Sequence, residues 1–123
     1  MRWTPRLWTS LAAISGFIAV AAGAFAAHGV ADPTAKDLLR TGSNYELAHA
    51  LATLACVALA PAMPRARLAA PWFLAGSVLF SGSLYALALG APRLAGLVTP
   101  LGGLAFLAGW AILAWAAGTS RHN

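Results

Sequence analysis

Four long apolar stretches joined by short polar loops constrain this chain more than any other feature of its sequence. They cover about residues 7–27, 45–60, 71–89 and 99–117. An α-helix rises about 1.5 Å per residue, so about 20 apolar residues cross the roughly 30 Å hydrocarbon core of a bilayer. Lipid cannot hydrogen-bond the backbone, so such spans fold as helices. We therefore predict an all-α membrane protein, a single domain over residues 1–123, whose four transmembrane helices form an antiparallel bundle.

The composition points to the same environment. Hydrophobic residues make up 60% of the chain and charged residues only 9%, whereas soluble domains carry about 25% charged residues. The net charge of +5 does not indicate a nucleic-acid partner, because the eight basic residues are scattered through loops and form no stripe. We expect the lipid bilayer as the partner. Cys56 is the single cysteine and lies within a span, which predicts a small core residue and excludes a disulfide within the chain.

The first apolar stretch has a second interpretation, as a signal peptide. Arg2 and Arg6 precede it, and Ala24-Phe25-Ala26 resembles a small-residue cleavage site. The stretch is long for a signal peptide, and three further hydrophobic stretches follow it. We therefore interpret it as the first span.

The second stretch is preceded by a helix-start signal. Asp32 fits an N-cap and Pro33 the first helical position. The next residues recur at spacings of four and three, which is one face of a helix: Leu38, Gly42, Tyr45, His49 and Ala52. This pattern predicts a short amphipathic helix between the first two spans. It would run into the span at 45–60, with Gly42-Ser43 as the place for a kink.

The basic residues differ in number between the two sides of the predicted bundle. Four spans place both termini on one side, together with the loop between the second and third spans. That side holds five basic residues: Arg2, Arg6, Arg65, Arg67 and Arg121. The other side holds Lys36, Arg40 and Arg93. Because cytoplasmic loops are enriched in Lys and Arg, we predict that both termini are cytoplasmic.

Polar side chains gather at the opposite, outer end of the spans. An ionisable residue within a membrane is costly and is a functional-site hypothesis by default. We take eight residues as a candidate polar ligand site: His28, Tyr45, Glu46, His49, Ser81, Ser83, Tyr85 and Thr99. Chain direction brings His28, His49 and Tyr85 to similar depths on three helices, so we predict that they share hydrogen bonds.

Three interpretations of this set stay open. Glu46 and His49 are three residues apart and so share a helical face, which suits a proton or substrate relay. With His28 they could form a metal site of two histidines and one carboxylate, although no diagnostic spacing supports it. The structural interpretation pairs Glu46 with Arg40 or Lys36 at the headgroup level. We predict no metal and no cofactor. We also predict no catalytic residue, because the serines lie in no Gly-x-Ser-x-Gly turn and their span holds no acid partner.

Small residues at four-residue spacing predict close helix packing, because membrane helices associate through contacts between small side chains. Glycine has a cost within a helix, so glycines are the more informative members. We predict packing roles for Gly16, Gly23, Gly82, Gly102, Gly103 and Gly109.

Four ordered motifs resemble a known family. They are Gly23-Ala24-Phe25-Ala26-Ala27-His28-Gly29, Tyr45 with His49-Ala50-Leu51-Ala52, Leu79-Phe80-Ser81-Gly82-Ser83-Leu84-Tyr85, and Thr99-Pro100-Leu101-Gly102-Gly103 through Gly109-Trp110. With their spacing they resemble the small membrane proteins of domain-of-unknown-function family 423. The resemblance covers nearly the whole chain and implies a multi-pass, four-helix protein of the bacterial inner membrane. It implies no activity.

This sequence departs from the family pattern at two positions. Ala26 stands where a second glycine is expected in the first motif, and Glu46 stands where glutamine is more usual. The second departure weakens any mechanism that requires a carboxylate at that position.

The predicted function is that of a small membrane protein that acts by binding, without catalysis, as an assembly partner. We expect a second copy of the chain or a larger membrane complex as its protein partner. The alternative is an oligomeric small-molecule or proton-linked transporter that uses the outer polar site. A haem- or quinone-binding protein is the third possibility.

Overall fold

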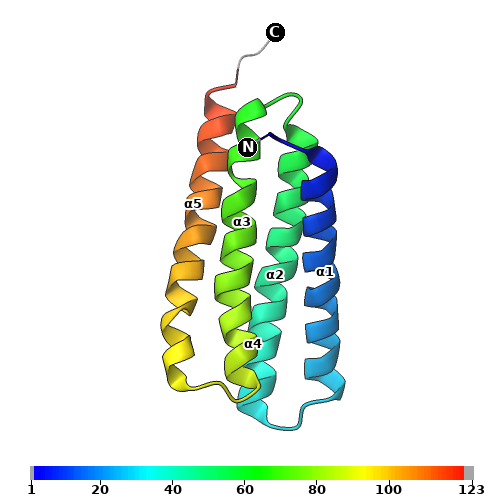
Figure 1. The fold of residues 1–123 in the computed structure, drawn as a ribbon, viewed down its shortest axis with the longest axis vertical. Coiled ribbons are helices and arrows are strands. Elements are labelled where there is room, and N and C mark those ends of the chain that lie inside the picture. Colours follow the sequence, from blue (N-terminus) through cyan, green and yellow to red (C-terminus); the bar gives the residue numbers. More distant parts are fainter. Residues whose placement is uncertain (1, 121–123) are drawn as a thin grey trace.

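The computed structural model describes residues 2–120, which form four antiparallel helical rods (Figure 1). The first rod is α1, Pro5–His28, and the second is α2, Pro33–Leu59. The third consists of η1 (Pro64–Leu68), α3 (Ala70–Gly76), the π-helical η2 (Ser77–Ser81) and α4 (Gly82–Ala88). The fourth consists of η3 (Arg93–Leu97) and α5 (Thr99–Gly118). The described residues contain no strand, so the predicted all-α class is confirmed.

The start of α2 follows the predicted chemistry. Asp32 is the N-cap, and its carboxylate accepts a hydrogen bond of 2.9 Å from the backbone N–H of Ala35. Pro33 occupies the first helical position, where its missing N–H costs no hydrogen bond. These local signals therefore place the loop between α1 and α2 correctly.

The second rod holds the predicted amphipathic segment and the predicted span in one helix. The segment expected as a short amphipathic helix is the first half of α2, a single helix of 27 residues. Gly42 does not mark a break between two helices; it lies against the ring of Tyr85, as described below. Thr41 and Ser43 beside it are not strong helix formers. The helix continues through this turn because it packs against α1 and α4.

Three segments are long and apolar enough to cross a membrane: Pro5–His28, Pro64–Ala88 and Arg93–Gly118. α2 is not among them. Its first half carries polar side chains and the charged residues Lys36, Asp37, Arg40 and Glu46, which lower its mean hydropathy. The predicted count of four spans is therefore supported for three of the rods.

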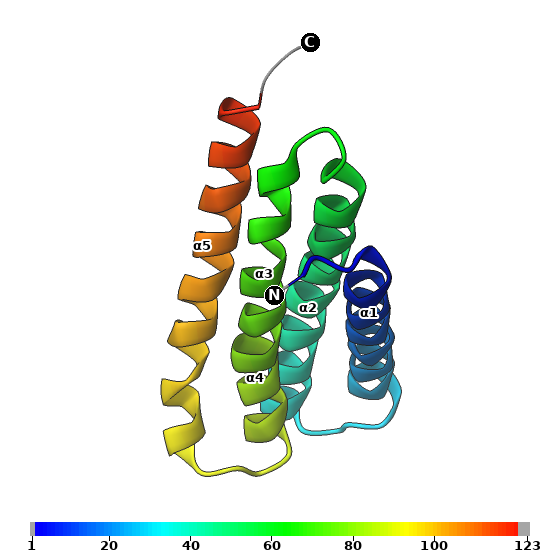
Figure 2. The same ribbon diagram turned by 45° about the horizontal axis from the view of Figure 1, so that its top comes forward.

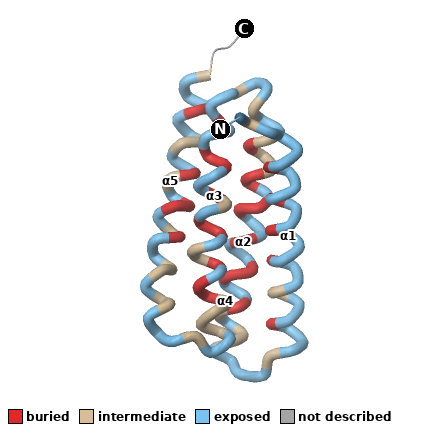
Figure 3. The backbone as a smooth tube through the Cα atoms, viewed as in Figure 1, coloured by how far each residue is buried: buried red, intermediate tan, exposed pale blue. Residues whose placement is uncertain are grey.

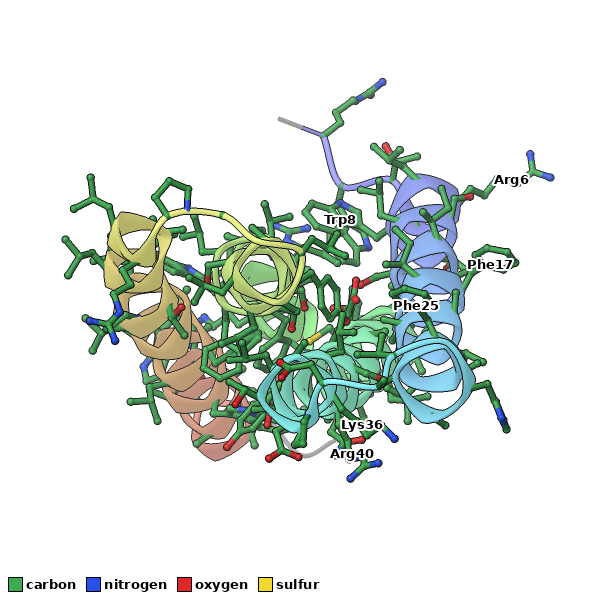
Figure 4. All side chains as sticks on the ribbon, turned by 90° about the horizontal axis from the view of Figure 1, so that it is seen from below. Arg6, Trp8, Phe17, Phe25, Lys36 and Arg40 are labelled. Atoms are coloured by element: carbon green, nitrogen blue, oxygen red, sulfur yellow. The ribbon has the colours of Figure 1, made fainter. Side chains whose placement is uncertain are left out.

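The four rods do not enclose a square core. α1 packs chiefly against α2, and α5 packs against the third rod, so α1 and α5 lie on opposite sides of the molecule (Figures 2 and 4). Buried residues line the inner sides of the rods (Figure 3). Large apolar side chains cover the outside, among them Phe17 at 77% exposure and Val78 at 72%. Such a surface suits lipid rather than water.

One compact core lies near the end of the bundle where α1 begins. It contains Trp8, Ala52, Cys56, Ala69, Ala70 and Phe73. Cys56 is fully buried there, which confirms the expectation of a small core residue. Trp8 points from α1 toward the third rod, whereas Arg6 and Phe17 point away from the bundle (Figure 4).

The six glycines predicted to pack lie in unlike surroundings. A Cβ at Gly102 would collide with the backbone of Phe80, one at Gly109 would lie 2.5 Å from the Phe73 ring, and one at Gly23 would lie 2.8 Å from Ser43 Oγ. Gly16 has only ordinary room, with the Ala50 Cβ at 3.9 Å. Gly82 and Gly103 differ from the prediction, because no heavy atom of the described residues comes within 4 Å of their Cβ positions.

Candidate functional site

Glu46 lies near the middle of α2, 13 residues after Pro33 and so about 20 Å along the helix. It is only 6% exposed. Ser15 Oγ of α1 donates a hydrogen bond of 2.9 Å to its Oε2, and Tyr85 Oη of α4 donates one of 2.7 Å to its Oε1. The carboxylate therefore joins three rods at the centre of the bundle.

This position corrects the interpretation in which Glu46 pairs with a basic residue at the headgroup level. Glu46 takes part in no ion pair with any described residue, and Lys36 and Arg40 lie on the outer side of α2 (Figure 4). The reason is the length of α2: it begins at Pro33, so Glu46 lies three to four turns inside the bundle and not at its entrance.

Gly42 allows Tyr85 to reach Glu46. A Cβ at Gly42 would lie 2.6 Å from Cε1 of the Tyr85 ring, so only glycine lets the ring pass this close to α2. Ser81 Oγ donates a hydrogen bond of 2.7 Å to the carbonyl of Gly42 and holds the π-helical segment against the same turn. The carboxylate one turn further along α2 is then within reach of the tyrosine hydroxyl.

His49 has both ring nitrogens occupied. Trp110 Nε1–H donates a hydrogen bond of 3.0 Å to His49 Nε2, which therefore acts as the acceptor. The proton of a neutral ring then lies on Nδ1, which donates to the carbonyl of Tyr45 at 2.7 Å. This assignment of the proton follows from the hydrogen-bond partners. It leaves neither nitrogen free to bind a metal, and neither of the two bonded partners is a group that titrates.

Aromatic rings surround His49 between α2, the third rod and α5. We call this the aromatic cluster: Tyr45, His49, Phe73, Phe80, Phe106 and Trp110. The rings of His49 and Phe106 stack with centroids 3.6 Å apart, and those of Phe73 and Trp110 lie 4.9 Å apart. The cluster fills this side of the molecule with side chains.

The opposite side of Glu46 is open. A cavity of about 360 Å³, which we call the α1–α3 groove, lies between α1 and the third rod. Its walls are mainly apolar, and three of its lining residues are polar: Ser15, Glu46 and Ser77. The Ser77 side chain is 4% exposed, and its hydroxyl oxygen has no hydrogen-bond partner among the described residues. Ser77 is also the first residue of the π-helical η2, and such π-helical turns are frequent at functional sites.

The eight candidate residues thus divide into separate groups. Glu46 and Tyr85 meet, Tyr45 and His49 belong to the aromatic cluster, and Ser81 binds Gly42. Ser83 Oγ and Thr99 Oγ1 lie 2.6 Å apart and join α4 to α5.

The prediction that His28, His49 and Tyr85 share hydrogen bonds is wrong for His28. Its ring is exposed at the end of α1 and makes no hydrogen bond within residues 2–120, while His49 and Tyr85 have different partners. The buried face of α1 includes Ala26. Two residues further on, a side chain points about 200° away around the helix, which turns His28 outward.

The described part of the chain holds no group of three His, Cys, Asp or Glu side chains that could bind a metal. The three residues considered for a metal site, His28, Glu46 and His49, therefore do not come together. The sequence also left four contributors unassigned to the site: Ser15, Ser77, Phe106 and Trp110. A signal existed for Ser15, since it shares a face of α1 with Ala12 and Ala19, three and four residues away.

The fold and the site define a small helical integral membrane protein with a buried polar network at its centre. The chain belongs to the family described as protein of unknown function (DUF423), which matches residues 22–103. This match confirms the resemblance seen in the sequence motifs.

Relatives of this chain occur in bacteria and fungi. It is 47% identical over 120 residues to the UPF0382 inner membrane protein YgdD of Escherichia coli K12, covering 89% of this chain and 88% of the relative. It is 44% identical over 119 residues to a UPF0382 membrane protein of Haemophilus influenzae, covering 93% and 95%. A UPF0382 membrane protein of Schizosaccharomyces pombe is 38% identical over 116 residues, covering 87% and 97%. No solved structure matches the chain.

Proposed function

We propose that this protein acts by binding, without catalysis, and that it takes an amphiphilic molecule from the bilayer into the α1–α3 groove. The observation that carries the proposal is Ser77, which lines the same cavity as Glu46 and whose buried hydroxyl oxygen has no partner in residues 2–120. An unpaired hydroxyl in apolar surroundings costs about 1–3 kcal/mol. A ligand group that pairs with it recovers this free energy.

The chemistry of the groove limits the ligand. Each oxygen of Glu46 accepts one hydrogen bond and retains a second lone pair, and Ser77 can both donate and accept. The other walls come from Leu11, Ile14, Ile18, Leu74, Ala75 and Val78. We therefore propose a ligand with a hydrocarbon body and a hydroxyl or amine, which enters sideways from the lipid.

A photoreactive probe tests this proposal. The full chain in lipid nanodiscs is irradiated with a long-chain alcohol that carries a diazirine, and the labelled peptides are identified by mass spectrometry. We expect labels on the segments Leu11–Ile18 and Leu74–Val78. Ala75→Phe fills the groove and should abolish most of the labelling, whereas Ala13→Phe places the same ring at an exposed position of α1 outside the groove lining.

Two results would overturn the proposal. One is labelling spread evenly over all lipid-facing helices. The other is equal labelling of the Ala75→Phe and Ala13→Phe variants, since the probe would then have bound elsewhere.

A proton-linked transporter is the second candidate, and one observation favours it. Glu46 lies midway along α2 with two hydroxyl donors and no cationic side chain among its bonded partners in the described residues. Such a carboxylate suits a group that takes up and releases a proton. Proteoliposomes with an internal pH-sensitive dye test this: proton flux that Glu46→Gln abolishes would support transport, and flux equal to that of empty liposomes would exclude it.

We further propose that α2 crosses the membrane as a fourth span with both termini in the cytoplasm. The support is the charge distribution. Arg2, Arg6, Arg65 and Arg67 lie at the end of the bundle where α1 begins, Lys36, Arg40 and Arg93 lie toward the other end, and Arg121 is outside the described residues. A reporter fused after Asn123 should be active only on the cytoplasmic side. Activity only on the outer side would reverse the topology.

Assembly with a protein partner, either a second copy or a larger membrane complex, is also part of the proposal. The support is the size of the chain: 123 residues allow little beyond the four rods, so we propose that it passes its ligand or its signal to another component. Chemical cross-linking in membranes followed by sizing tests this. A species that stays at the mass of one chain would contradict it.

A further inference from the structure

The end of the bundle where α1 begins and α5 ends is at the top of Figure 1. Residues at this end line a second cavity. It has a volume of about 860 Å³ and is bordered by α1, the start of the third rod and the last turns of α5. Two arginines and four tryptophans line it: Arg2, Trp3, Trp8, Arg67, Trp72 and Trp115. We call it the Arg–Trp cavity. It is separate from the α1–α3 groove, and Glu46 lines the groove and not this cavity.

The charged side chains that line the Arg–Trp cavity are both basic. The chain has three acidic residues. Asp32 and Asp37 lie at the far end of the bundle, where α2 begins, and Glu46 lies near the middle of α2. No acidic side chain is therefore available to pair with Arg2 or Arg67. The nearby Arg65 lies over the ring of Trp115, with the guanidinium carbon 4.9 Å from the ring centroid.

We propose that the Arg–Trp cavity binds the headgroup of an acidic phospholipid. Guanidinium groups match phosphate oxygens with two parallel hydrogen bonds. Arg2, in the segment before α1, and Arg67, in η1, both line the cavity. The volume falls within the range of about 300–1,000 Å³ that is usual for small-molecule sites.

The tryptophans fit the same occupant. The rings of Trp3 and Trp8 stack with centroids 5.5 Å apart and planes 16° apart, and Trp8 is 8% exposed. Tryptophan favours the depth of the headgroups, where one side of the ring meets hydrocarbon and the other meets water. Leu68, Pro71 and Ile112 add apolar walls for the glycerol and the first carbons of the acyl chains. A bilayer lipid satisfies both parts, the charged and the apolar.

The test measures lipid binding to the full chain in detergent by quenching of tryptophan fluorescence with brominated lipids. Brominated phosphatidylglycerol is compared with brominated phosphatidylcholine of the same acyl chains. We expect phosphatidylglycerol to bind the natural sequence at least about tenfold more tightly. The double variant Arg2→Gln with Arg67→Gln should weaken that binding by about fivefold for each arginine removed.

The control is a double variant of equal net charge, Arg6→Gln with Arg93→Gln, because neither arginine lines the cavity. It should bind phosphatidylglycerol like the natural sequence. Arg67→Lys keeps the charge without the paired hydrogen bonds, so it should bind with intermediate strength even if the glutamine variant fails to fold.

Three results would overturn the proposal. The two lipids could bind the natural sequence equally, which would show that charge is not recognised. The control could lose as much affinity as the cavity variant, which would show an unspecific charge effect. Water-soluble glycerol phosphate could displace the lipid at micromolar concentration, which would assign the cavity to a free anion.

Discussion

The two sides of the bundle that meet at α2 differ in how their space is filled. In the aromatic cluster, both ring nitrogens of His49 are hydrogen-bonded and its ring stacks on Phe106. The α1–α3 groove, on the side of Glu46, keeps about 360 Å³ of space and a hydroxyl without a partner in the described residues. His49 and Glu46 are three residues apart on one helix.

The difference separates structural from functional roles of polar residues in a membrane. A histidine whose nitrogens are both bonded and whose ring is stacked contributes to stability and has no capacity left for a ligand. An acid and a serine beside an open space retain such capacity. The aromatic cluster should therefore respond to mutation through stability, and the groove through binding.

The largest expected effect is on the aromatic cluster. Phe106 is 4% exposed and stacks on His49, so Phe106→Ala should lower the free energy of unfolding by about 3–5 kcal/mol. Leu107 is the next residue and is 66% exposed, so Leu107→Ala should change it by less than about 1 kcal/mol. Thermal unfolding in detergent measures both. Equal losses would mean that the cluster is not a packed core.

The second effect concerns the approach of α5 to the third rod. Gly102→Ala should cost about 1–3 kcal/mol, because the new Cβ would collide with the Phe80 backbone. Gly103→Ala places the same methyl group where no described atom lies within 4 Å, so it should be neutral or stabilise the helix by up to about 1 kcal/mol. A stable Gly102→Ala variant would contradict the close packing of these two rods.

The third effect is on the bonds of Glu46. Tyr85→Phe removes a hydrogen bond to a carboxylate and should cost about 1.5–3 kcal/mol. Tyr45→Phe removes a hydroxyl from a residue that is 47% exposed and whose hydroxyl makes no hydrogen bond within residues 2–120, so its stability should be unchanged. Chemical unfolding of the two variants makes the comparison. A loss of stability in both variants, or in neither, would contradict the hydrogen bond between Tyr85 and Glu46.

The smallest expected effect on stability lies in the groove. Ser77→Ala removes a buried hydroxyl without a described partner, so the free energy of unfolding should stay the same or rise by up to about 1 kcal/mol. Labelling by the diazirine alcohol should nevertheless fall several-fold. Ser81→Ala is the matched control, since it breaks the bond to Gly42 and should cost about 1 kcal/mol without changing the labelling. Destabilisation by Ser77→Ala would show that the hydroxyl has a structural partner.

The sequence allowed the helical class and the start of α2 at Pro33 to be predicted. It also placed Glu46 and Tyr85 in one candidate site, and the two side chains are hydrogen-bonded to each other. The depth of Glu46 in the bundle was not predicted. The second span was expected to begin at residue 45, which put Glu46 at its start, whereas Glu46 lies in the middle of a 27-residue helix. Hydropathy places the apolar residues, whereas the length of α2 depends on helix formers that are polar. His28 was assigned by depth alone, and its direction around α1 turns it outward.

The partners of the polar groups were harder to predict than the groups themselves. Trp110 and Ser15 reach His49 and Glu46 across 61 and 31 residues of chain. Such pairs depend on the rotation of each helix about its axis, which small residues such as Gly42 and Gly102 set through close contacts. A pattern along one helix shows which face is polar. It does not show which residue of another helix meets that face.

The most direct test of the α1–α3 groove as a binding site is an experimental density map of the full chain purified in native lipid nanodiscs. We predict a non-protein molecule between α1 and the third rod, with a polar atom about 2.7–3.2 Å from Ser77 Oγ. A groove closed by α1 packing onto α3, with the Ser77 hydroxyl bonded to its own helix, would contradict the proposed function.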